Sequence, residues 1–259
     1  MRLLIILAII CASVTLHSQS TETFPVDSKL KNVRIDLEYG DLVLTESSKN
    51  EITLTKKVSI NQGLENEKYS VVTRESGSEF TLAASINQEE LEYIILGCDE
   101  GSNKVVKKDK VDEMKKAGDR WDCYSTSIDV TLELSVPKGV KVYVETLYGD
   151  VEIKQASNLK RVEATYGDVT VVNNLGWKDD VKIQSTYGFV DLSIPKSVNA
   201  DLKLTTSYGE IFTDMDLHKK EHKKFRNTPH GNNVVATMNN GGPSIFLEAT
   251  YDNIYLRKS

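Results

Sequence analysis

Apolar and polar residues alternate along much of the chain, and the alternation recurs around tyrosines. Val142 and Val144 precede Tyr148 in one phase, and Val151 and Ile153 continue that phase after it. A period of two places every second side chain on one face of a β-strand. The positions between are mostly polar. Each unit therefore predicts a strand, a tight bend at the tyrosine and a second strand, with one apolar face and one wet face.

The unit occurs six times in the same phase. Most copies continue the tyrosine with a glycine and an acidic residue, although Phe189 replaces the acid once and Asp252 replaces the glycine in the last copy. The six copies are Tyr39-Gly40-Asp41, Tyr148-Gly149-Asp150, Tyr166-Gly167-Asp168, Tyr187-Gly188, Tyr208-Gly209-Glu210 and Tyr251.

The spacing of the copies favours one β architecture over another. From Tyr148 onward, successive tyrosines up to Tyr208 are 18, 21 and 21 residues apart. A period near 20 is typical of coils that stack on one another in a solenoid. We therefore predict an all-β fold with a right-handed parallel β-solenoid. The alternative is an antiparallel β-sandwich, whose turns recur every ~8–12 residues without a repeated motif in one phase.

The tyrosine unit has a structural interpretation and a functional one. Structurally, the glycine adopts positive φ at the bend, the acid bonds local N–H groups, and the ring covers the edge of the core. Stacked coils would then place the tyrosines in a ladder ~4.8 Å apart. Functionally, a row of tyrosines and acids suggests sugar or calcium binding. Phe189 interrupts that acid column, and Ca²⁺ needs ~6 or more oxygen ligands, so the structural interpretation is favoured.

Two insertions interrupt the array. The first copy lies 109 residues before the second, and strand-like runs fill the gap at 51–60, 69–74, 80–86, 91–96 and 127–136. Within the gap, residues 110–118 predict a short helix. A second insertion covers residues 216–234. The sixth copy comes at the end of the chain, and we expect it to supply the terminal strands.

Composition and charge narrow the class of protein. Of the 259 residues, 39% are hydrophobic and 27% charged, as in a folded soluble protein. A formal net charge of −6 argues against a nucleic-acid partner, which usually needs a basic face.

The N-terminus indicates export. The apolar run Leu3–Ala12 follows a basic start and is too short to span a ~30 Å bilayer core. Cleavage near residues 16–20 makes residues 1–20 a signal peptide. A lipidated Cys11 is disfavoured because Ile10 stands where a small residue is expected. With no further apolar span, the mature chain is expected without a transmembrane segment, in the periplasm or on the cell surface.

The mature chain keeps two cysteines, Cys98 and Cys123. An even number of cysteines in an exported protein favours a disulfide over free buried thiols. The bond would close a loop of about 25 residues, worth ~3 kcal/mol in the chain-entropy model.

One stretch has the spacing of a catalytic motif. His218 and His222 with Glu221 match H-x-x-E-H, the inverted zinc-peptidase pattern. The chemistry needs both histidines on one helix face and a third ligand, whereas this stretch is a lysine-rich insertion between β-units. A solvated loop is the better interpretation. We therefore predict no catalytic residues, no metal and no cofactor.

The repeats resemble a known family. The "YGDV" units at Tyr148 and Tyr166, the lead-in "VPKGVKV" (136–142) and the closing stretch 239–259 look like the bacterial putative-adhesin family. The resemblance is best over 127–259 and extends from Phe24. It implies an exported, repeat-built β-protein of unknown biochemical function, and it carries no catalytic residue to transfer.

These observations give one domain with two parts and a ranked set of functions. Residues 21–136 form an irregular β region with the disulfide-stapled insertion, and 137–259 form the β-solenoid repeats, continuous as one adhesin-like domain. The first hypothesis is a non-enzymatic envelope or cell-surface protein, an adhesin or interaction scaffold for an unknown protein or glycan partner. The alternatives are a periplasmic envelope-stress regulatory module and, less favoured, a carbohydrate-active β-helix enzyme.

Overall fold

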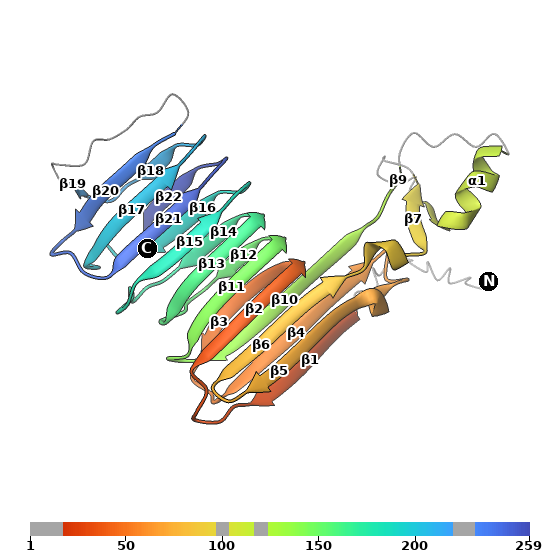
Figure 1. Cartoon of the computed structure of the whole chain (residues 1–259), viewed down its shortest axis with the longest axis horizontal. Coiled ribbons are helices and arrows are strands. Elements are labelled where there is room, and N and C mark those ends of the chain that lie inside the picture. The colour runs from red at the N-terminus through yellow and green to blue at the C-terminus, as the bar shows by residue number, and fades with distance from the viewer. Residues whose placement is uncertain (1–17, 97–103, 117–123, 220–230) are drawn as a thin grey trace, which may run out of the picture.

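The computed structural model describes residues 18–96, 104–116, 124–219 and 231–259. The chain is mainly β, with a nine-stranded sheet, a ten-stranded sheet and a small three-stranded sheet. The two large sheets form the long body of the molecule, and the small sheet projects from one end (Figure 1).

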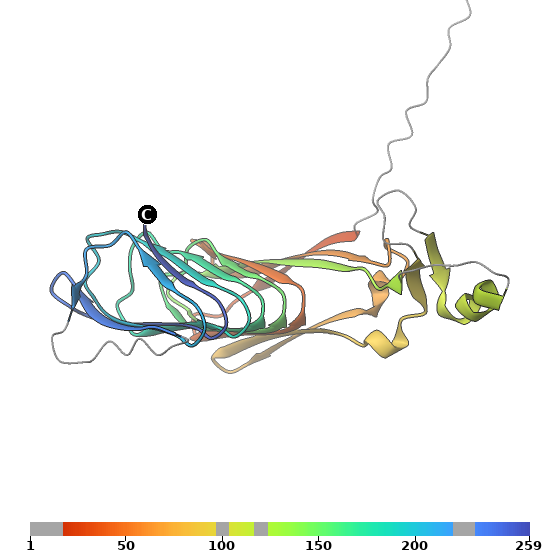
Figure 2. The same cartoon turned by 90° about the horizontal axis from the view of Figure 1, so that it is seen from above.

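Each of the six tyrosine units forms two strands joined at the bend. The first strand joins the ten-stranded sheet and the second joins the nine-stranded sheet, so the two sheets are the long sides of stacked coils (Figure 2). The pairs are β2 (Asn32–Tyr39) with β3 (Asp41–Ser47), β11 (Lys141–Tyr148) with β12 (Val151–Ile153), β13 (Leu159–Tyr166) with β14 (Val169–Val172), β15 (Val181–Ser185) with β16 (Val190–Ile194), β17 (Ala200–Thr206) with β18 (Ile211–Thr213), and β21 (Ser244–Ala249) with β22 (Ile254–Lys258).

Neighbouring coils pair in parallel through equivalent residues. Val144 of β11 lies opposite Ile35 of β2 on one side and Val162 of β13 on the other. The repeat region is therefore a parallel array, as the spacing predicts, and the antiparallel sandwich does not describe it. Equivalent residues meet because each unit has its apolar positions in the same phase, and a shift by one residue would turn that phase outward.

The order of coils in the stack differs from their order in the chain. The ten-stranded sheet runs β19-β20-β17-β21-β15-β13-β11-β2-β6-β5, so the last unit, at Tyr251, lies between the units of Tyr187 and Tyr208. As expected, the sixth copy supplies the last two strands of the chain, β21 and β22, but these strands lie inside the stack and not at its end. The other edge of β17 is already paired with the antiparallel strand β20 (Asn233–Met238). β21 therefore pairs with the free edge of β17 and, on its other side, with β15, which places it between these two strands.

The N-terminal part continues both sheets beyond the first coil. β10 (Ile128–Pro137) pairs in parallel with β3 and, on its other side, antiparallel with β4 (Glu51–Ile60). The edge strand β1 (Ser18–Pro25) then pairs antiparallel with β4. β6 (Glu79–Ile86) pairs in parallel with β2, and β5 (Tyr69–Ser76) covers its outer edge. The first coil can thus stack directly on the second, although 109 residues separate their bends. The strand-like runs predicted in this gap correspond to strands.

The small sheet is formed from part of the first insertion. It contains β7 (Tyr93–Leu96), β8 (Lys104–Lys107) and β9 (Tyr124–Ser125), with the helix α1 (Lys108–Lys116) beside it. The predicted helix is confirmed. Single 3-10 turns occur at Asn66–Lys68 and Gln88–Glu90. Cys98 and Cys123 lie outside the described residues, as does most of the expected signal peptide.

The core lies between the two large sheets and is continuous along the whole stack. Its buried residues run from Leu30 to Leu256, and in most repeat strands they alternate with more exposed ones. Burial of an aliphatic side chain contributes about 1.5–3 kcal/mol. One coil exposes its core on both sides, so the coils are stable only when stacked. No helix of the described residues is long and apolar enough to cross a membrane.

Candidate functional site

The six tyrosines form one column along the bends. Adjacent rings have centroids 4.7–5.0 Å apart, and their planes differ by 3–19°. The spacing equals the strand separation of a sheet, because each coil contributes one ring. The order is Tyr39, Tyr148, Tyr166, Tyr187, Tyr251 and Tyr208.

The rings lie outside the core, contrary to the expectation that they would cover its edge. Five of them are 38–61% exposed, and Tyr39 is half-buried. The alternation of the strand stops at the bend, since Leu147 and Tyr148 are both exposed. Within the column each ring face covers its neighbour. The column therefore presents ring edges and hydroxyl groups rather than open ring faces to the solvent.

The glycine of the bend is required mainly by the close approach of the coils. Gly167, Gly188 and Gly209 do not have positive φ, unlike Gly40 and Gly149. A Cβ on Gly167 would overlap the carbonyl oxygen of Gly149 in the next coil, well inside the 3.0 Å that real Cβ atoms keep. The predicted role of positive φ therefore applies to the first two coils only, and stacking explains the glycine in the others.

The acid after the glycine links one coil to the next. The Oδ1 atom of Asp41 accepts the N–H of Asp150 at 2.8 Å, and that of Asp150 accepts the N–H of Asp168 at 2.8 Å. Asp168 in turn accepts the N–H of Phe189 at 3.0 Å. In the last unit Asn253 has this role and accepts the N–H of Glu210 at 2.8 Å. The carboxylates thus bond backbone of the adjacent coil, and not of their own bend.

Hydroxyl side chains two residues before the tyrosine also bind the bend, a role that sequence analysis missed. Ser185 donates to the carbonyl of Gly167 at 2.7 Å and accepts the N–H of Gly188 at 3.0 Å. Thr206 donates to the carbonyl of Gly209 at 2.7 Å. A serine or threonine in an otherwise apolar phase was the available signal.

The wet face beside the column pairs its charges internally. Arg34 lies over the ring of Tyr143, 5.0 Å from its centroid. Glu163 forms ion pairs with Arg161 and Lys182. Self-paired charges on a solvated sheet contribute little net field, so this face is a poor candidate for a charged ligand.

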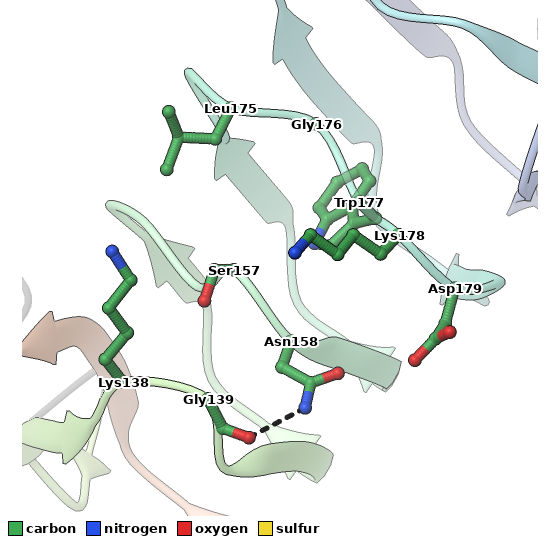
Figure 3. A pocket seen from close by; sticks show the side chains of 9 residues that line it. All are labelled: Lys138, Gly139, Ser157, Asn158, Leu175, Gly176, Trp177, Lys178 and Asp179. Carbon is green, nitrogen blue, oxygen red and sulfur yellow. Dashed lines mark hydrogen bonds between the residues drawn. The ribbon is translucent and has the colours of Figure 1, made fainter.

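A pocket of 540 Å³ lies at the opposite bends, where the nine-stranded sheet returns to the ten-stranded one. Loops before β11, β13 and β15 form it, so three adjacent coils contribute (Figure 3). We call it the Trp177 pocket and define it by Lys138, Ser157, Asn158, Leu175, Trp177, Lys178 and Asp179. Its volume is within the ~300–1,000 Å³ range of ligand pockets.

Residues 110–245 match the sequence profile of the family described as Toastrack DUF4097. The chain belongs to this toastrack family. The resemblance to bacterial adhesin-like repeat proteins is thereby confirmed. No curated protein matches the chain.

The chain is also similar to solved bacterial structures. One, described as a "putative cell adhesion protein" from Clostridium sporogenes, has 12% identity and a TM-score of 0.58, and the match covers 94% of this chain and 100% of that one. Another, a "putative adhesin" from Bacteroides fragilis, has 13% identity and a TM-score of 0.28, with coverage of 93% and 97%. The first likeness supports the fold alone.

The toastrack chain offers little for metal chemistry in its described part. Those residues contain no group of three His, Cys, Asp or Glu side chains that could hold a metal ion. His218 lies in the short strand β19 (His218–Lys219), not on a helix. His222 and Glu221 lie outside the described residues.

Asp41, Asp150 and Asp168 each bond the backbone of the next coil, and we call this row the carboxylate ladder. The ladder makes the stability of the toastrack chain depend on pH in a way that can be tested. Burial raises the pKa of Asp41 and of Asp168, and the neighbouring carboxylate of Asp150 adds to the rise. A raised pKa means that the folded state binds the proton more tightly than the unfolded state. Ionisation of these two aspartates therefore lowers the free energy of unfolding. This loss of stability is absent below the ordinary aspartate pKa of ~3.9, grows as the pH rises towards the raised pKa, and is complete above it.

We expect Asp168→Asn to stabilise the protein at pH 7 by a few tenths of a kcal/mol, because Asn253 shows that an amide oxygen can accept the same bond. The gain should disappear near pH 4. Asp168→Ala, which loses the bond to Phe189, should cost about 1 kcal/mol. Urea unfolding at both pH values measures this. Equal stability of the Asn and Ala variants would contradict the ladder.

Proposed function

We propose that the protein is an exported, non-enzymatic protein of the cell envelope or surface, which presents a rigid β-array to a protein or glycan partner. It acts as an adhesin or as an interaction scaffold. In this proposal residues 1–20 are removed as a signal peptide, Cys98 and Cys123 form a disulfide, and the stack winds to the right, as most parallel crossovers do. Residues 21–136 and 137–259 together form one domain.

The exposed tyrosine column is the observation that carries the proposal. Tyrosine is enriched at protein interfaces because it combines a large apolar body with a polar tip. Here five rings are more than one third exposed. Each lies on a bend that is bonded to the next coil, for example through Asp41 and Asp150. A rigid row of this kind loses little conformational entropy when a partner binds.

The fold relative from Clostridium sporogenes, described as a "putative cell adhesion protein", is in keeping with the same role. A carbohydrate-active enzyme needs a pair of carboxylates facing a groove at defined separation. The acids of the ladder instead bond backbone N–H groups, which supports a structural role for them.

Surface exposure can be tested on intact cells of the source bacterium. We expect added protease to degrade the protein, while a periplasmic marker in the same cells stays intact. Cells that lack the protein should also adhere less to their substratum, and the wild-type gene should restore adhesion. Protection from protease until the envelope is opened would contradict the surface adhesin and favour the periplasmic envelope-stress module.

The contribution of the tyrosine column can be tested separately. Replacing Tyr166, Tyr187 and Tyr251 by serine should abolish the restored adhesion, because it removes the middle of the column. The matched control is Tyr143→Ser, a tyrosine on the wet face and outside the column. Equal adhesion by both variants would show that the column is not the binding surface.

A further inference from the structure

The Trp177 pocket is a formed site whose residues have no role in stacking the coils through the tyrosine bends. It lies at the bends opposite the tyrosine column, between the loops that precede β11, β13 and β15 (Figure 3). Strands β12 to β15 beside it are each paired on both sides within their sheets. No strand edge is available there, so an extended peptide could not bind by strand addition.

The wall of the pocket is held in place by hydrogen bonds. Trp177 is only 7% exposed, and its Nε1–H donates to the carbonyl of Ala156 at 2.9 Å. The buried Asn173 donates to the carbonyl of Gly176 at 3.2 Å and accepts the N–H of Leu175 at 3.1 Å. These bonds fix the loop before β15. The pocket therefore exists before any ligand binds.

Neighbouring loops are also tied to one another. The Nδ2 atom of Asn158 donates to the carbonyl of Gly139 at 2.9 Å, and the N–H of Val142 donates to the carbonyl of Asn158 at 3.2 Å. Among the described residues, the Oδ1 atom of Asn158 and the hydroxyl of Ser157 form no hydrogen bond, and both residues line the pocket (Figure 3). Both can bond hydroxyl groups of a ligand.

The charges at the pocket are predominantly positive. Lys138 and Lys178 line it, and within the described part of the chain neither forms an ion pair. The one carboxylate of the pocket, Asp179, is paired with Lys160, whose hydrogen bond holds the pKa of Asp179 below its usual range. Two ammonium groups outside any ion pair are notable in a chain with a net charge of −6, although Lys178 also acts on the adjacent Asp179 and the Glu46 carboxylate accepts the N–H of Ser157. They would attract an anion and raise its local concentration.

We propose that the Trp177 pocket binds an acidic saccharide, a sugar whose ring carries a carboxylate. The carboxylate lies between Lys138 and Lys178, ring hydroxyls bond Ser157 and Asn158, and the apolar face of the ring packs against Leu175. Leu175 is 66% exposed at the rim, so a ligand in the pocket could remove its apolar side chain from water. A single inorganic anion would fill little of the 540 Å³.

This inference rests on the proposed function, since it names the glycan as the partner class and gives it a site. Purified mature protein is titrated by calorimetry with a glucuronate-containing hyaluronan tetrasaccharide and, separately, with neutral chitotetraose. We expect the acidic sugar to bind at least tenfold more tightly, with an affinity that falls as salt is added.

The variants separate this pocket from general surface charge. Lys138→Gln with Lys178→Gln should weaken binding of the acidic tetrasaccharide at least tenfold, and Leu175→Ala several-fold. The matched control is Lys196→Gln, because Lys196 follows Pro195 in a bend as Lys138 follows Pro137, and it lies outside the pocket. That variant should bind within twofold of the wild type.

Three outcomes would overturn the proposal. They are equal binding of the neutral and acidic sugars, unchanged binding by the double lysine variant, and tighter binding of polyglutamate than of the saccharide at the same lysines. The pocket can fail to bind the acidic saccharide while protease still degrades the protein on intact cells and the cells still adhere through it. In that case the acidic-saccharide site is wrong and the proposed surface role stands. If the pocket binds the acidic saccharide but the protein in intact cells is protected from protease, the saccharide site stands and the proposed surface role is wrong.

Discussion

Replacing Gly167 by alanine is expected to destabilise the protein by about 3–5 kcal/mol. The new Cβ would overlap the carbonyl oxygen of Gly149 in the adjacent coil. No rotamer change relieves a clash between two backbones. The coils would have to separate at this bend, which weakens bonds such as that from the N–H of Val151 to the carbonyl of Asp168, 2.9 Å long.

The matched control is Gly77→Ala, in the turn between β5 and β6. Gly77 has a φ of +61° and nothing within 4 Å of an added Cβ. The substitution should lower the free energy of unfolding by only roughly 1–2 kcal/mol, because alanine is strained in the left-handed conformation but meets no neighbouring atom. Urea unfolding of both variants decides between the two causes. A cost for Gly167→Ala no greater than that for Gly77→Ala would mean that stacking does not require the glycine.

Deleting residues 243–259 is expected to abolish cooperative folding altogether. These residues form β21 and β22, which occupy the inside of the stack and pair on both sides. The deletion removes Ile245, Leu247, Ile254 and Leu256, all almost completely buried. At about 1.5–3 kcal/mol each, their loss is comparable to the ~5–15 kcal/mol by which a domain is stable.

The control is a truncation at the other end of the chain, up to Thr23. It removes most of β1, an exposed edge strand that pairs only with β4, and retains Phe24, which packs against the core. This variant should keep a cooperative thermal transition measured by circular dichroism. A similar transition in the C-terminal deletion would place the last unit at the edge of the stack.

Hydrogen exchange tests the same arrangement without a deletion. The amide of Ile254 donates to the carbonyl of Glu210 in the neighbouring coil at 2.9 Å. Ends of chains usually exchange quickly. We expect the amides of β22 to exchange as slowly as those of β16 in the middle of the array, although they lie within a few residues of the C-terminus.

Much of the fold is determined by local patterns and could be predicted. Alternation of the kind seen at Val142 and Val144 specifies strands because the period of side chains on a strand is two. The recurrence of one phase at similar spacing specifies parallel stacking, because equivalent apolar residues then meet in the same register. The strands of the first insertion were predictable for the same local reason.

The candidate site was less predictable. Tyr148, Gly149 and Asp150 were recognised as a structural repeat, but the direction of the ring and the reason for the glycine depend on the neighbouring coil. Trp177 and Lys178 belong to no motif. They form a pocket only because the loop before β15 lies beside those that carry Lys138 and Ser157.

The sequence by itself determined that this chain is an array of β coils with bends at the tyrosines. The tertiary structure alone decided which coils are neighbours, with the Tyr251 unit between those of Tyr187 and Tyr208. The physical reason is that the coils have nearly interchangeable faces. Parallel pairing of like units is equally good in many orders, and β20 settles the order because it occupies the outer edge of β17.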